Sequence, residues 1–443
     1  MAVKIREFDD PAPPAINERH SSWSDAVRAN ENDLSRIESE AIGFIKSVVN
    51  RYNLPVVVGF SGGKDSLTTY LLVEKALGHS PPMFFMDTGL ELPETVDYVH
   101  GLAEDRGAKI IGGSAGDSFW RSLPAFGPPA RDFRWCCKVL KLGPAATAIA
   151  ESMGGRTLTF MGQRRLESFR RSKEPRVTHN PWVPGQISAN PIRGWNALEV
   201  WLYIFWQGVS FNPLYQRGYH RMGCYLCPAS PLAEIEALRR THPQLYSRWH
   251  EALVEWAEEH GLPLEWAELG FWRWKHLPPA QQELAKKLGL SLKPDRVAPT
   301  QTLTLSITRG VSPCTSAGYS AEGQFSSGLD IHRIAQVLPI FGETKVSDEL
   351  GALRVVSKHV TITIFSSGSL TVRGAQESHV EKTLAPLERA VRRSLFCQGC
   401  GSCIPQCPSH ALYLGDDGKI TVDPDLCTQC LKCDSFPCPT YLK

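Results

Sequence analysis

The chain has 443 residues, of which 42% are hydrophobic and 21% are charged. This length suits about two to four domains with cores of their own, and the composition excludes general disorder. The formal net charge of only +2 excludes a global field for nucleic acid or a membrane surface, although a local basic patch stays open.

Strands and helices alternate through the first half of the chain. After an arm expected over residues 1–35, a helical pattern leads into an apolar strand at Leu54–Phe60. Further strands are predicted at Met83–Met86, Lys109–Gly112 and Thr157–Met161, with amphipathic helices between them. This alternation predicts an α/β fold, a parallel sheet with helices on both faces.

The second half changes character twice. Helical periodicity and many tryptophans fill residues 190–290, and two β-rich stretches follow at Thr302–Thr308 and Val360–Arg373. We assign no chemistry to the small α+β domain that these stretches predict. The expected domains are an arm over 1–35, the α/β domain over 36–230, a helical extension over 231–295, the α+β domain over 296–392 and a cysteine-rich module over 393–443.

No signal peptide or membrane span is predicted. The N-terminal residues mix acids and bases without an apolar segment, and the longest apolar runs are far too short to cross a bilayer. We therefore expect a cytoplasmic protein with no membrane partner. In that reducing compartment the clustered cysteines are metal ligands more often than disulfides.

A glycine-rich loop follows the first strand and opens a helix. Its residues are Ser61, Gly62, Gly63, Lys64, Asp65 and Ser66. Glycines let backbone N–H groups approach phosphate oxygens, and the helix N-terminus adds its positive end. Lys64 supplies a point charge for a phosphoryl group, and Asp65 is a candidate ligand for Mg²⁺. The loop resembles the PP-loop of the adenine nucleotide alpha-hydrolase superfamily, which includes ATP-dependent adenylating enzymes. A turn that merely caps a helix is the alternative.

Further blocks extend this resemblance over residues 40–230. They are Asp87-Thr88-Gly89, Pro93-Glu94-Thr95, Gly162-Gln163-Arg164-Arg165 and Asn212-Pro213-Leu214-Tyr215. Together they resemble phosphoadenosine-phosphosulfate (PAPS) and adenylyl-sulfate (APS) reductases. Asp87 ends a predicted strand, where open sheets bind ligands, so it is a candidate for Mg²⁺ or a ribose hydroxyl.

The resemblance implies a site of basic residues around the loop. Guanidinium groups suit sulfate and phosphate oxygens, whereas the alternative is a solvated charged segment. The catalytic candidates are Lys64, Asp87, Arg164 and Arg165. The candidate nucleotide ligands are the six loop residues with Asp87, Gly162, Arg164, Arg170 and Arg171.

Four cysteines in the middle of the chain add a second signal. They are Cys136, Cys137, Cys224 and Cys227. Their spacing matches the cluster-binding pattern of assimilatory APS reductases, and four thiolates suit a [4Fe–4S] cluster, with zinc as the main rival. Lys138 and Lys141 either place positive charge near this cluster or the substrate, or are surface lysines.

Eight cysteines crowd the C-terminal module in two similar sets. They are Cys397, Cys400, Cys403 and Cys407, then Cys427, Cys430, Cys433 and Cys438. The module resembles bacterial two-cluster ferredoxins, in which the remote fourth cysteine ligates the other cluster. We expect Cys438 to complete the first [4Fe–4S] site and Cys407 the second, making three clusters in the chain. Structural zinc and disulfides are the alternatives.

Two features depart from the reductases. Their catalytic cysteine near the C-terminus has no counterpart, because only Cys314 remains outside the clusters and it lacks the local motif; we expect it to be structural. The loop also keeps both Lys64 and Asp65, which fits ATP cleavage.

Three functions follow from these features. The first is a reductase of APS or PAPS that draws electrons through the ferredoxin-like module from a redox partner or a low-potential donor. The second is an ATP-dependent sulfurtransferase acting on RNA, DNA or a small molecule. The third is a non-catalytic nucleotide and redox sensor. A homo-oligomer stays open.

Overall fold

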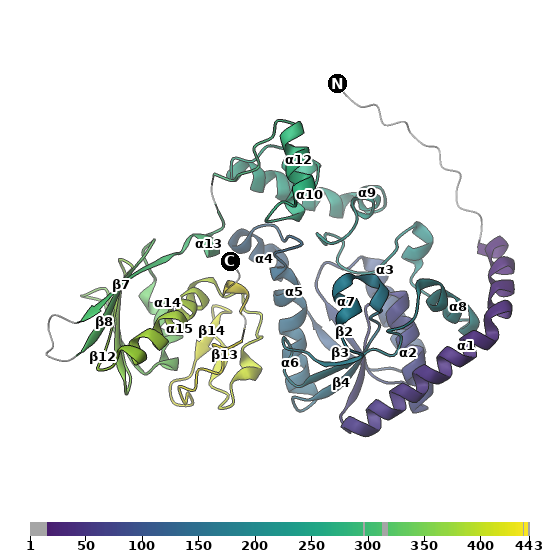
Figure 1. The fold of residues 1–443 in the computed structure, drawn as a ribbon, viewed down its shortest axis with the longest axis horizontal. Helices are drawn as coiled ribbons and strands as arrows, with labels where there is room; N and C mark the ends of the chain where they lie inside the picture. Colours follow the sequence, from purple (N-terminus) through teal and green to yellow (C-terminus); the bar gives the residue numbers. More distant parts are fainter. Residues whose placement is uncertain (1–15, 296, 312–317, 437, 442–443) are drawn as a thin grey trace.

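The computed structural model describes residues 16–295, 297–311, 318–436 and 438–441 (Figure 1). Helix α1 (Ile16–Tyr52) begins well before residue 36, so residues 16–35 of the expected arm are helical. The early part of α1 is held by tertiary contact, because Trp23 stacks on Phe205 with ring centroids 4.8 Å apart. Sequence periodicity could not show this partner.

A six-stranded sheet forms the centre of the α/β domain. In sheet order its strands are β3 (Ile110–Ser114), β2 (Met83–Asp87), β1 (Val56–Gly59), β4 (Thr157–Met161), β6 (Gln186–Ala189) and β5 (Val177–His179). The first five are parallel, and β5 pairs antiparallel with β6 at one edge. The four expected strands are confirmed; β5 and β6, which are short and partly polar, were not predicted.

Helices cover both faces of this sheet, as predicted. Val57 and Phe84 point to the face covered by α6 (Gly143–Ser152), whereas Val58 and Phe85 point to the opposite face. The helices on that face are α1, α2 (Lys64–Leu77), α3 (Pro93–Asp105) and α8 (Ala197–Gln207). Alternate residues of each strand thus serve two separate cores.

Helices also join the α/β domain to the rest of the chain. The segment before α6 consists of α4 (Ser118–Phe126), α5 (Trp135–Cys137) and the π-helical turn η1 (Lys138–Leu142). The extension, at the top of Figure 1, contains α9 (Leu232–Thr241), α10 (Pro243–Glu259), α11 (Glu265–Glu268) and α12 (Pro279–Lys287). A core rich in aromatic residues, including Trp135 and Trp249, packs α4 and η1 against α10.

A second six-stranded sheet is antiparallel throughout. In sheet order its strands are β7 (Leu305–Val311), β8 (Tyr319–Phe325), β12 (Ser369–Gly374), β11 (Val360–Phe365), β10 (Ala352–Val356) and β9 (Glu343–Ser347). The expected hairpin of β11 and β12 is confirmed; β8, β9 and β10 were not predicted. Helices α14 (Ile331–Ala335) and α15 (Glu377–Phe396) contact this sheet.

The cysteine-rich module shares its core with the second sheet. Leu387 and Val391 of α15 belong to the same buried cluster as Cys397, Cys407 and Cys433. A small hairpin, β13 (Leu412–Leu414) with β14 (Ile420–Val422), completes the module. Figure 1 shows the module, in yellow, between the antiparallel sheet and helices α5 and α6 of the α/β domain.

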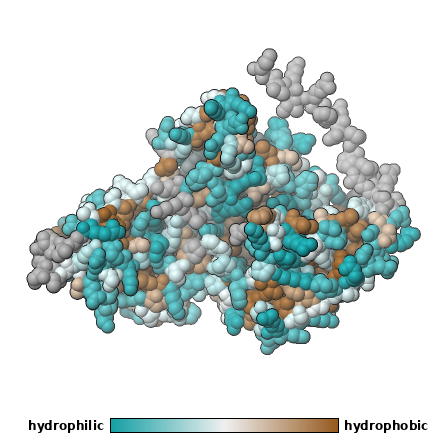
Figure 2. Space-filling model, in the orientation of Figure 1, coloured by the Kyte–Doolittle hydropathy of each residue, from teal (hydrophilic) through white to brown (hydrophobic). Residues whose placement is uncertain are grey.

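The surface is mixed in character. Figure 2 shows hydrophobic residues in separate patches among hydrophilic ones on the face drawn. Among the described residues, no helix combines the length and the apolar character needed to span a bilayer.

Candidate functional site

The glycine-rich loop joins the end of β1 to the start of α2, as predicted. The Ser61 N–H donates to Ser66 Oγ at 3.2 Å, and the Ser66 hydroxyl donates to the Gly63 carbonyl at 2.8 Å. Gly62 adopts φ 70°, which glycine accepts without strain. The loop therefore curls around its own serines and presents the N-terminus of α2 to a ligand, where backbone N–H groups favour anions.

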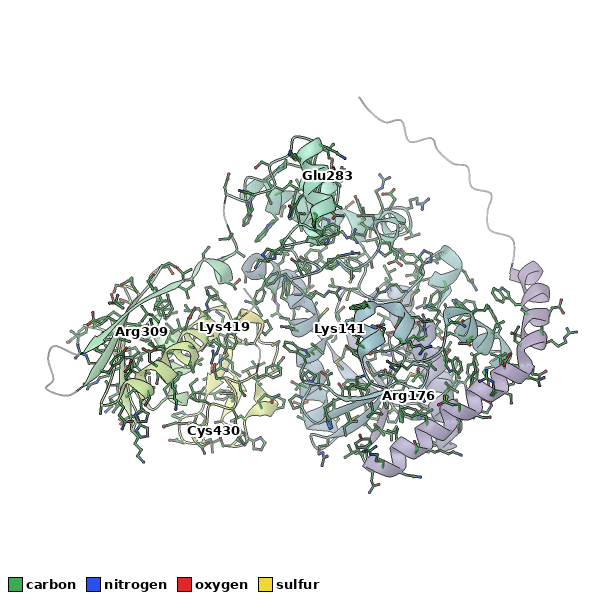
Figure 3. The ribbon with its side chains drawn as sticks, in the orientation of Figure 1. Lys141, Arg176, Glu283, Arg309, Lys419 and Cys430 are labelled. Atoms are coloured by element: carbon green, nitrogen blue, oxygen red, sulfur yellow. The ribbon has the colours of Figure 1, made fainter. Side chains whose placement is uncertain are left out.

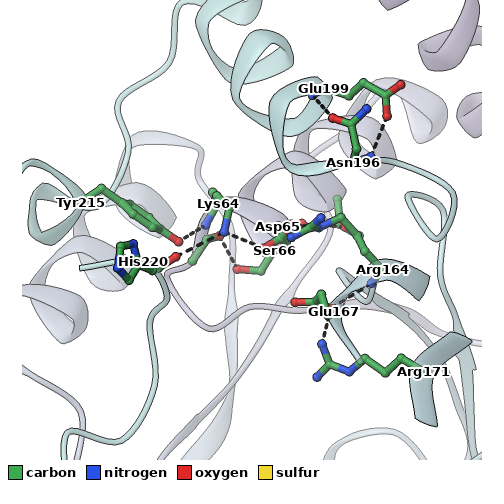
Figure 4. Close-up of polar contacts among 12 residues, drawn as sticks. Lys64, Asp65, Ser66, Arg164, Glu167, Arg171, Asn196, Glu199, Tyr215 and His220 are labelled. Carbon is green, nitrogen blue, oxygen red and sulfur yellow. Dashed lines mark hydrogen bonds and ion pairs between the residues drawn. The ribbon is translucent and has the colours of Figure 1, made fainter. Parts of the chain in front are cut away.

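Two buried cations of the site share one carboxylate (Figure 4). Lys64 Nζ lies 3.2 Å from Asp65 Oδ2, and Arg164 Nε donates to Asp65 Oδ1 at 2.5 Å. Tyr215 contributes as well, because its hydroxyl accepts from the Lys64 N–H at 2.8 Å. This network fixes the loop against the segment that follows β4. It also means that both oxygens of Asp65, an expected Mg²⁺ ligand, contact cations.

Gly162 brings the end of β4 onto the loop. A Cβ built on Gly162 would lie 2.8 Å from Ser66 N and closer still to the Asp65 carbonyl, so only glycine fits this approach. The residue was predicted as a nucleotide ligand. Its position here explains the need for glycine through backbone packing between the two segments.

The remaining predicted residues lie in different surroundings. Asp87 stands at the end of β2, as expected, but its carboxylate accepts from the Gly89 N–H and the Ser114 hydroxyl, both at 2.8 Å. Arg165 is exposed, and Arg171 pairs with Glu167. The side chain of Arg170 lies outside the described part of the structure. Of the predicted arginines, Arg164 and Arg171 are therefore the two that the structure brings to the loop.

Two hollows adjoin the loop. The first, of about 1400 Å³, runs from Ser61, Gly63 and Ser66 past Gly162 and is called the loop hollow. The second, of about 1970 Å³, lies on the other side of Lys64 and is called the basic hollow. Asp65, Gln163, Glu167, Arg171 and Arg221 line both. The cations that line only the basic hollow are Lys64, Arg131, Arg134, Lys138 and Arg164.

The loop hollow extends to two charged residues that lie next to the middle cysteines. Glu91 and Lys141 line it, and the Lys141 ammonium lies 3.5 Å from Glu91 Oε1. The Cys224 thiol donates to the same Glu91 oxygen at 3.9 Å. The Cys224 thiol raises the pKa of Lys141, and Glu91 adds to the effect. One hollow therefore runs from the phosphate-type loop to Glu91, whose carboxylate contacts the Cys224 thiol.

The four middle cysteines lie together, although they come from α5 and from the segment after α8. A hydrogen bond with Cys137, burial, and then the thiols of Cys224 and Cys227 raise the pKa of Cys136. The hydrogen bond from Cys136 lowers the pKa of Cys137, and Lys141 and Arg134 lower it further. Positive charge beside four converging thiols suits a group that needs thiolate ligands.

The pKa shifts of the C-terminal thiols show which of these thiols affect one another. Burial raises the pKa of Cys403 well above its usual range, with additions from Cys400, Cys438 and Cys397. Burial likewise raises the pKa of Cys427, with additions from Cys433, Cys407 and Cys430. A hollow of about 430 Å³, called the module hollow, is lined by the first group, Cys397, Cys400, Cys403 and Cys438.

Arg393 supports a negatively charged group at these sites. Its side chain is 1% exposed, lines the module hollow and donates to the Cys433 carbonyl at 3.2 Å. Its Nε is buried with no hydrogen-bond partner in the described structure. Burial works against its charge, but Tyr441, Cys403 and Cys433 together raise its pKa. A buried cation facing thiols fits thiolate-held iron–sulfur clusters.

The described cysteines are all free thiols, which argues against the disulfide alternative. Across the described ranges, no three or more His, Cys, Asp and Glu side chains form a ready-made site for a metal ion. The cysteines are therefore grouped by the effect of each thiol on the pKa of the others and by the buried cations beside them. Cys314 lies outside the described residues.

Sequence reasoning missed three residues that shape the site. Glu91 lies between two blocks that resemble the reductases, and Arg221 lies three positions before Cys224. Tyr215 stood within a noted block without an assigned role. Only its position between two motifs could have pointed to Glu91, because its contact with Cys224 joins segments far apart in the chain.

Known proteins resemble parts of this chain. Residues 55–230 match the model of the phosphoadenosine phosphosulfate reductase domain. An uncharacterized protein of Methanocaldococcus jannaschii is 41% identical over 279 residues, which cover 62% of this chain and 58% of that protein. A second uncharacterized protein of the same organism is 34% identical over 273 residues, which cover 61% of this chain and 64% of that protein. The chain therefore spans less than two thirds of either relative.

More distant relatives have named activities. The adenosine 5'-phosphosulfate reductase of Allochromatium vinosum is 29% identical over 203 residues, which cover 43% of this chain and 74% of that protein. A crystal structure of phosphoadenylyl-sulfate reductase from Candida auris is 21% identical with a TM-score of 0.33, covering 43% of this chain and 94% of that one. Residues 55–230 are thus similar to the PAPS reductase domain and to APS reductases.

Proposed function

We propose that the protein is an iron–sulfur oxidoreductase of the PAPS/APS reductase type, which reduces an adenylylated sulfate to sulfite. One observation carries this proposal. The loop hollow begins at the anion-binding N-terminus of α2 and ends at Glu91 and Lys141, beside Cys224. A nucleotide whose phosphates lie at the loop can therefore extend its sulfate toward the middle cysteines.

Different residues at and around the loop hollow would bind different parts of the nucleotide. In this proposal the loop binds the phosphate groups together with Lys64, which lines the adjoining basic hollow. Arg171 and Arg221 add positive charge along the loop hollow. Lys141 stands at the far end and neutralises the sulfate. In the reaction two electrons are added to the sulfur atom, the bond from sulfur to the bridging phosphate oxygen breaks, and sulfite and the adenosine phosphate leave.

Three cysteine sites hold the redox groups in this proposal. Each would bind one [4Fe–4S] cluster, which accepts and passes on single electrons when bound. The sites are Cys136 with Cys137, Cys224 and Cys227; Cys397 with Cys400, Cys403 and Cys438; and Cys427 with Cys430, Cys433 and Cys407. A redox partner protein or another low-potential donor supplies the two electrons one at a time to the C-terminal module.

A second candidate is an ATP-dependent sulfurtransferase. The basic hollow favours it, because Arg131 and Arg134 line a large space next to Lys64 and Asp65. Such a space suits an anionic acceptor, RNA included, that would be adenylated there and then attacked by a sulfur nucleophile. The two candidates differ in the fate of the nucleotide, since only the transferase releases pyrophosphate from ATP.

Direct assay separates the two candidates. Anaerobically purified holoprotein is incubated with APS, PAPS or ATP and a reduced viologen, and sulfite and pyrophosphate are measured. We expect sulfite from APS or PAPS and none from Lys64→Ala, whereas Lys46→Ala, an exposed lysine of α1, behaves as the unaltered chain. Pyrophosphate from ATP without sulfite from either sulfate ester would overturn the reductase proposal in favour of the transferase.

A further inference from the structure

The C-terminal module contacts the α/β domain at the start of α6. A Cβ built on Gly143 would lie 2.6 Å from Ser402 Oγ and closer still to the Cys400 carbonyl. The contact is repeated one turn later, where a Cβ on Gly401 would lie 3.0 Å from Thr147 Oγ1. Backbone therefore rests on backbone at this point, and the approach depends on the missing side chain of Gly143.

Two of the proposed cysteine sites share lining residues at this contact. They are called the middle site (Cys136, Cys137, Cys224 and Cys227) and the Cys400 site (Cys397, Cys400, Cys403 and Cys438). Phe126 and Val139 of the α/β domain line the module hollow together with Cys397 and Cys438. In the other direction, Cys400 packs against the same apolar cluster as Cys136 and Cys224. Val139 follows the middle cysteines within η1 and also lines the module hollow, so η1 belongs to both walls.

Lys138 lies between the two sites. It follows Cys137 directly, and its ammonium stands 4.0 Å from the centre of the Trp182 ring. That ring meets Phe436 of the module edge-on, with centroids 6.4 Å apart, and Phe436 lines the module hollow. Burial lowers the pKa of Lys138, although Cys438 and Cys137 both oppose that shift. Its place in the chain beside Cys137 and its contact with the Trp182 ring, which meets Phe436, put this cation between the two sites.

The third proposed site, called the Cys430 site, faces away from the middle site. It consists of Cys427, Cys430, Cys433 and Cys407. Cys430 is exposed, and Figure 3 shows it in the module, well separated from Lys141 of the middle site. Arg393 lies between the two module sites, since Cys403 of one and Cys433 of the other both act on it. The order from solvent inward is therefore the Cys430 site, the Cys400 site and the middle site.

We propose that Gly143 and Lys138 are positioning residues that hold the Cys400 site against the middle site, so that electrons pass directly between them without movement of the module. The inference rests on the proposed redox function of the cysteine sites. Each transfer oxidises the Cys400 site and reduces the middle site by one electron, with no proton moved and no bond changed. The Cys430 site takes the electron from the external low-potential donor.

The first test changes the contact by one carbon atom. Gly143→Ala places a methyl group against the Cys400 backbone, whereas Gly101→Ala in α3 adds the same group where no atom lies within 4 Å. Both holoproteins are reduced anaerobically and studied by electron paramagnetic resonance. We expect loss of the magnetic splitting between the middle site and the Cys400 site in Gly143→Ala only, at unchanged iron content. Splitting that persists would overturn the role of Gly143.

The second test removes the shared charge, and it decides the matter if Gly143→Ala does not fold. A nearby positive charge favours the reduced, more negative form of a cluster. Lys138→Met should therefore lower the midpoint potentials of both the middle site and the Cys400 site, while Lys138→Arg leaves both unchanged. A shift at one site alone, or at neither, contradicts the shared position of Lys138.

These readouts do not depend on sulfite. If no nucleotide yields sulfite but the splitting and the paired shift are seen, the proposed reaction fails and the contact between sites stands. If sulfite forms while Gly143→Ala and Lys138→Met change neither signal, the reaction stands and the inference fails.

Discussion

The phosphate-type loop and the C-terminal module balance buried positive charge in different ways. At the loop, Lys64 and Arg164 share the carboxylate of Asp65. In the module, Arg393 forms no ion pair with a carboxylate among the described residues, and it faces the thiol and carbonyl of Cys433 instead. A buried charge without a partner costs several kcal/mol. The loop thus balances its buried cations with the carboxylate oxygens of Asp65. In the module, the counter-charge for Arg393 has to come from cysteine sulfur.

The strongest test of this difference is Arg393→Met. Methionine keeps most of the volume but removes a buried cation that is affected by thiols of both module groups. Without it, the negative charge of thiolate-held iron loses a buried counter-charge. We expect the module to lose its iron while the middle site stays loaded, as measured by iron content and by electron paramagnetic resonance.

Arg354→Met is the matched control, because Arg354 is an exposed arginine on β10 of the neighbouring sheet. It should keep the iron of the module. Full iron content in Arg393→Met would show that the module thiolates bind iron without the positive charge of Arg393.

A second effect is expected at the loop from Asp65→Ala. This change leaves both Lys64 and Arg164 buried without their carboxylate, which typically destabilises a protein by about 3–5 kcal/mol. Denaturant unfolding of the α/β domain measures the loss. The control is Asp33→Ala, whose exposed pair with Arg36 is worth at most about 1 kcal/mol. Equal losses in the two variants would contradict a buried, shared carboxylate.

A smaller effect is expected from Gly162→Ala, which leaves every charge in place. The added methyl group meets the backbone of Asp65 and Ser66, and such overpacking costs about 1–3 kcal/mol. We expect weaker binding of adenine nucleotide in calorimetry with iron content unchanged. Gly113→Ala on β3, where no atom lies within 4 Å, should bind as the unaltered chain does; similar weakening in both would remove the loop contact as the cause.

The two regions also differ in what the sequence could predict. The loop and its strand–helix context follow from local pattern, because Ser61 to Ser66 stand between an apolar strand and an amphipathic helix. The same pattern could not show that Asp87 would use its carboxylate on Gly89 and Ser114. It also could not show that Glu91 would reach Cys224, since this contact depends on how the helical segments fold back over the sheet.

Prediction of the fold failed where tertiary contacts outweigh local signals. The start of α1 is held by the stacking of Trp23 on Phe205, and β5 and β6 extend an existing sheet despite short, partly polar sequences. The contact of Gly143 with Cys400 is likewise invisible in either segment alone. The two groups of module cysteines expected from the resemblance to ferredoxins contain thiols that affect one another's pKa, while their role as cluster ligands stays a prediction.

The smallest effect concerns a carboxylate near the edge of the same domain. Glu94 contacts His242 at 3.0 Å and pairs with Arg217. Burial works to raise the pKa of Glu94, but a backbone hydrogen bond, His242 and Arg217 together lower it. A carboxyl whose folded pKa is depressed contributes stability that is present above its unfolded pKa, about 4.3, and that is lost as the pH falls through the folded value.

Glu94→Gln should therefore reduce stability at pH 7 by at most about 1 kcal/mol and flatten the decline of melting temperature between neutral and acid pH. The exposed pair of Glu236 with Arg239 provides the control, because Glu236→Gln neutralises a carboxylate that has far less buried contact. A steeper acid decline in Glu94→Gln than in the unaltered chain would show that Glu94 opposes folding. A flatter decline of melting temperature would show that the charge of Glu94 stabilises the fold, as that of Asp65 does. Both carboxylates would then balance cations of the α/β domain, whereas cysteine sulfur balances Arg393 in the module.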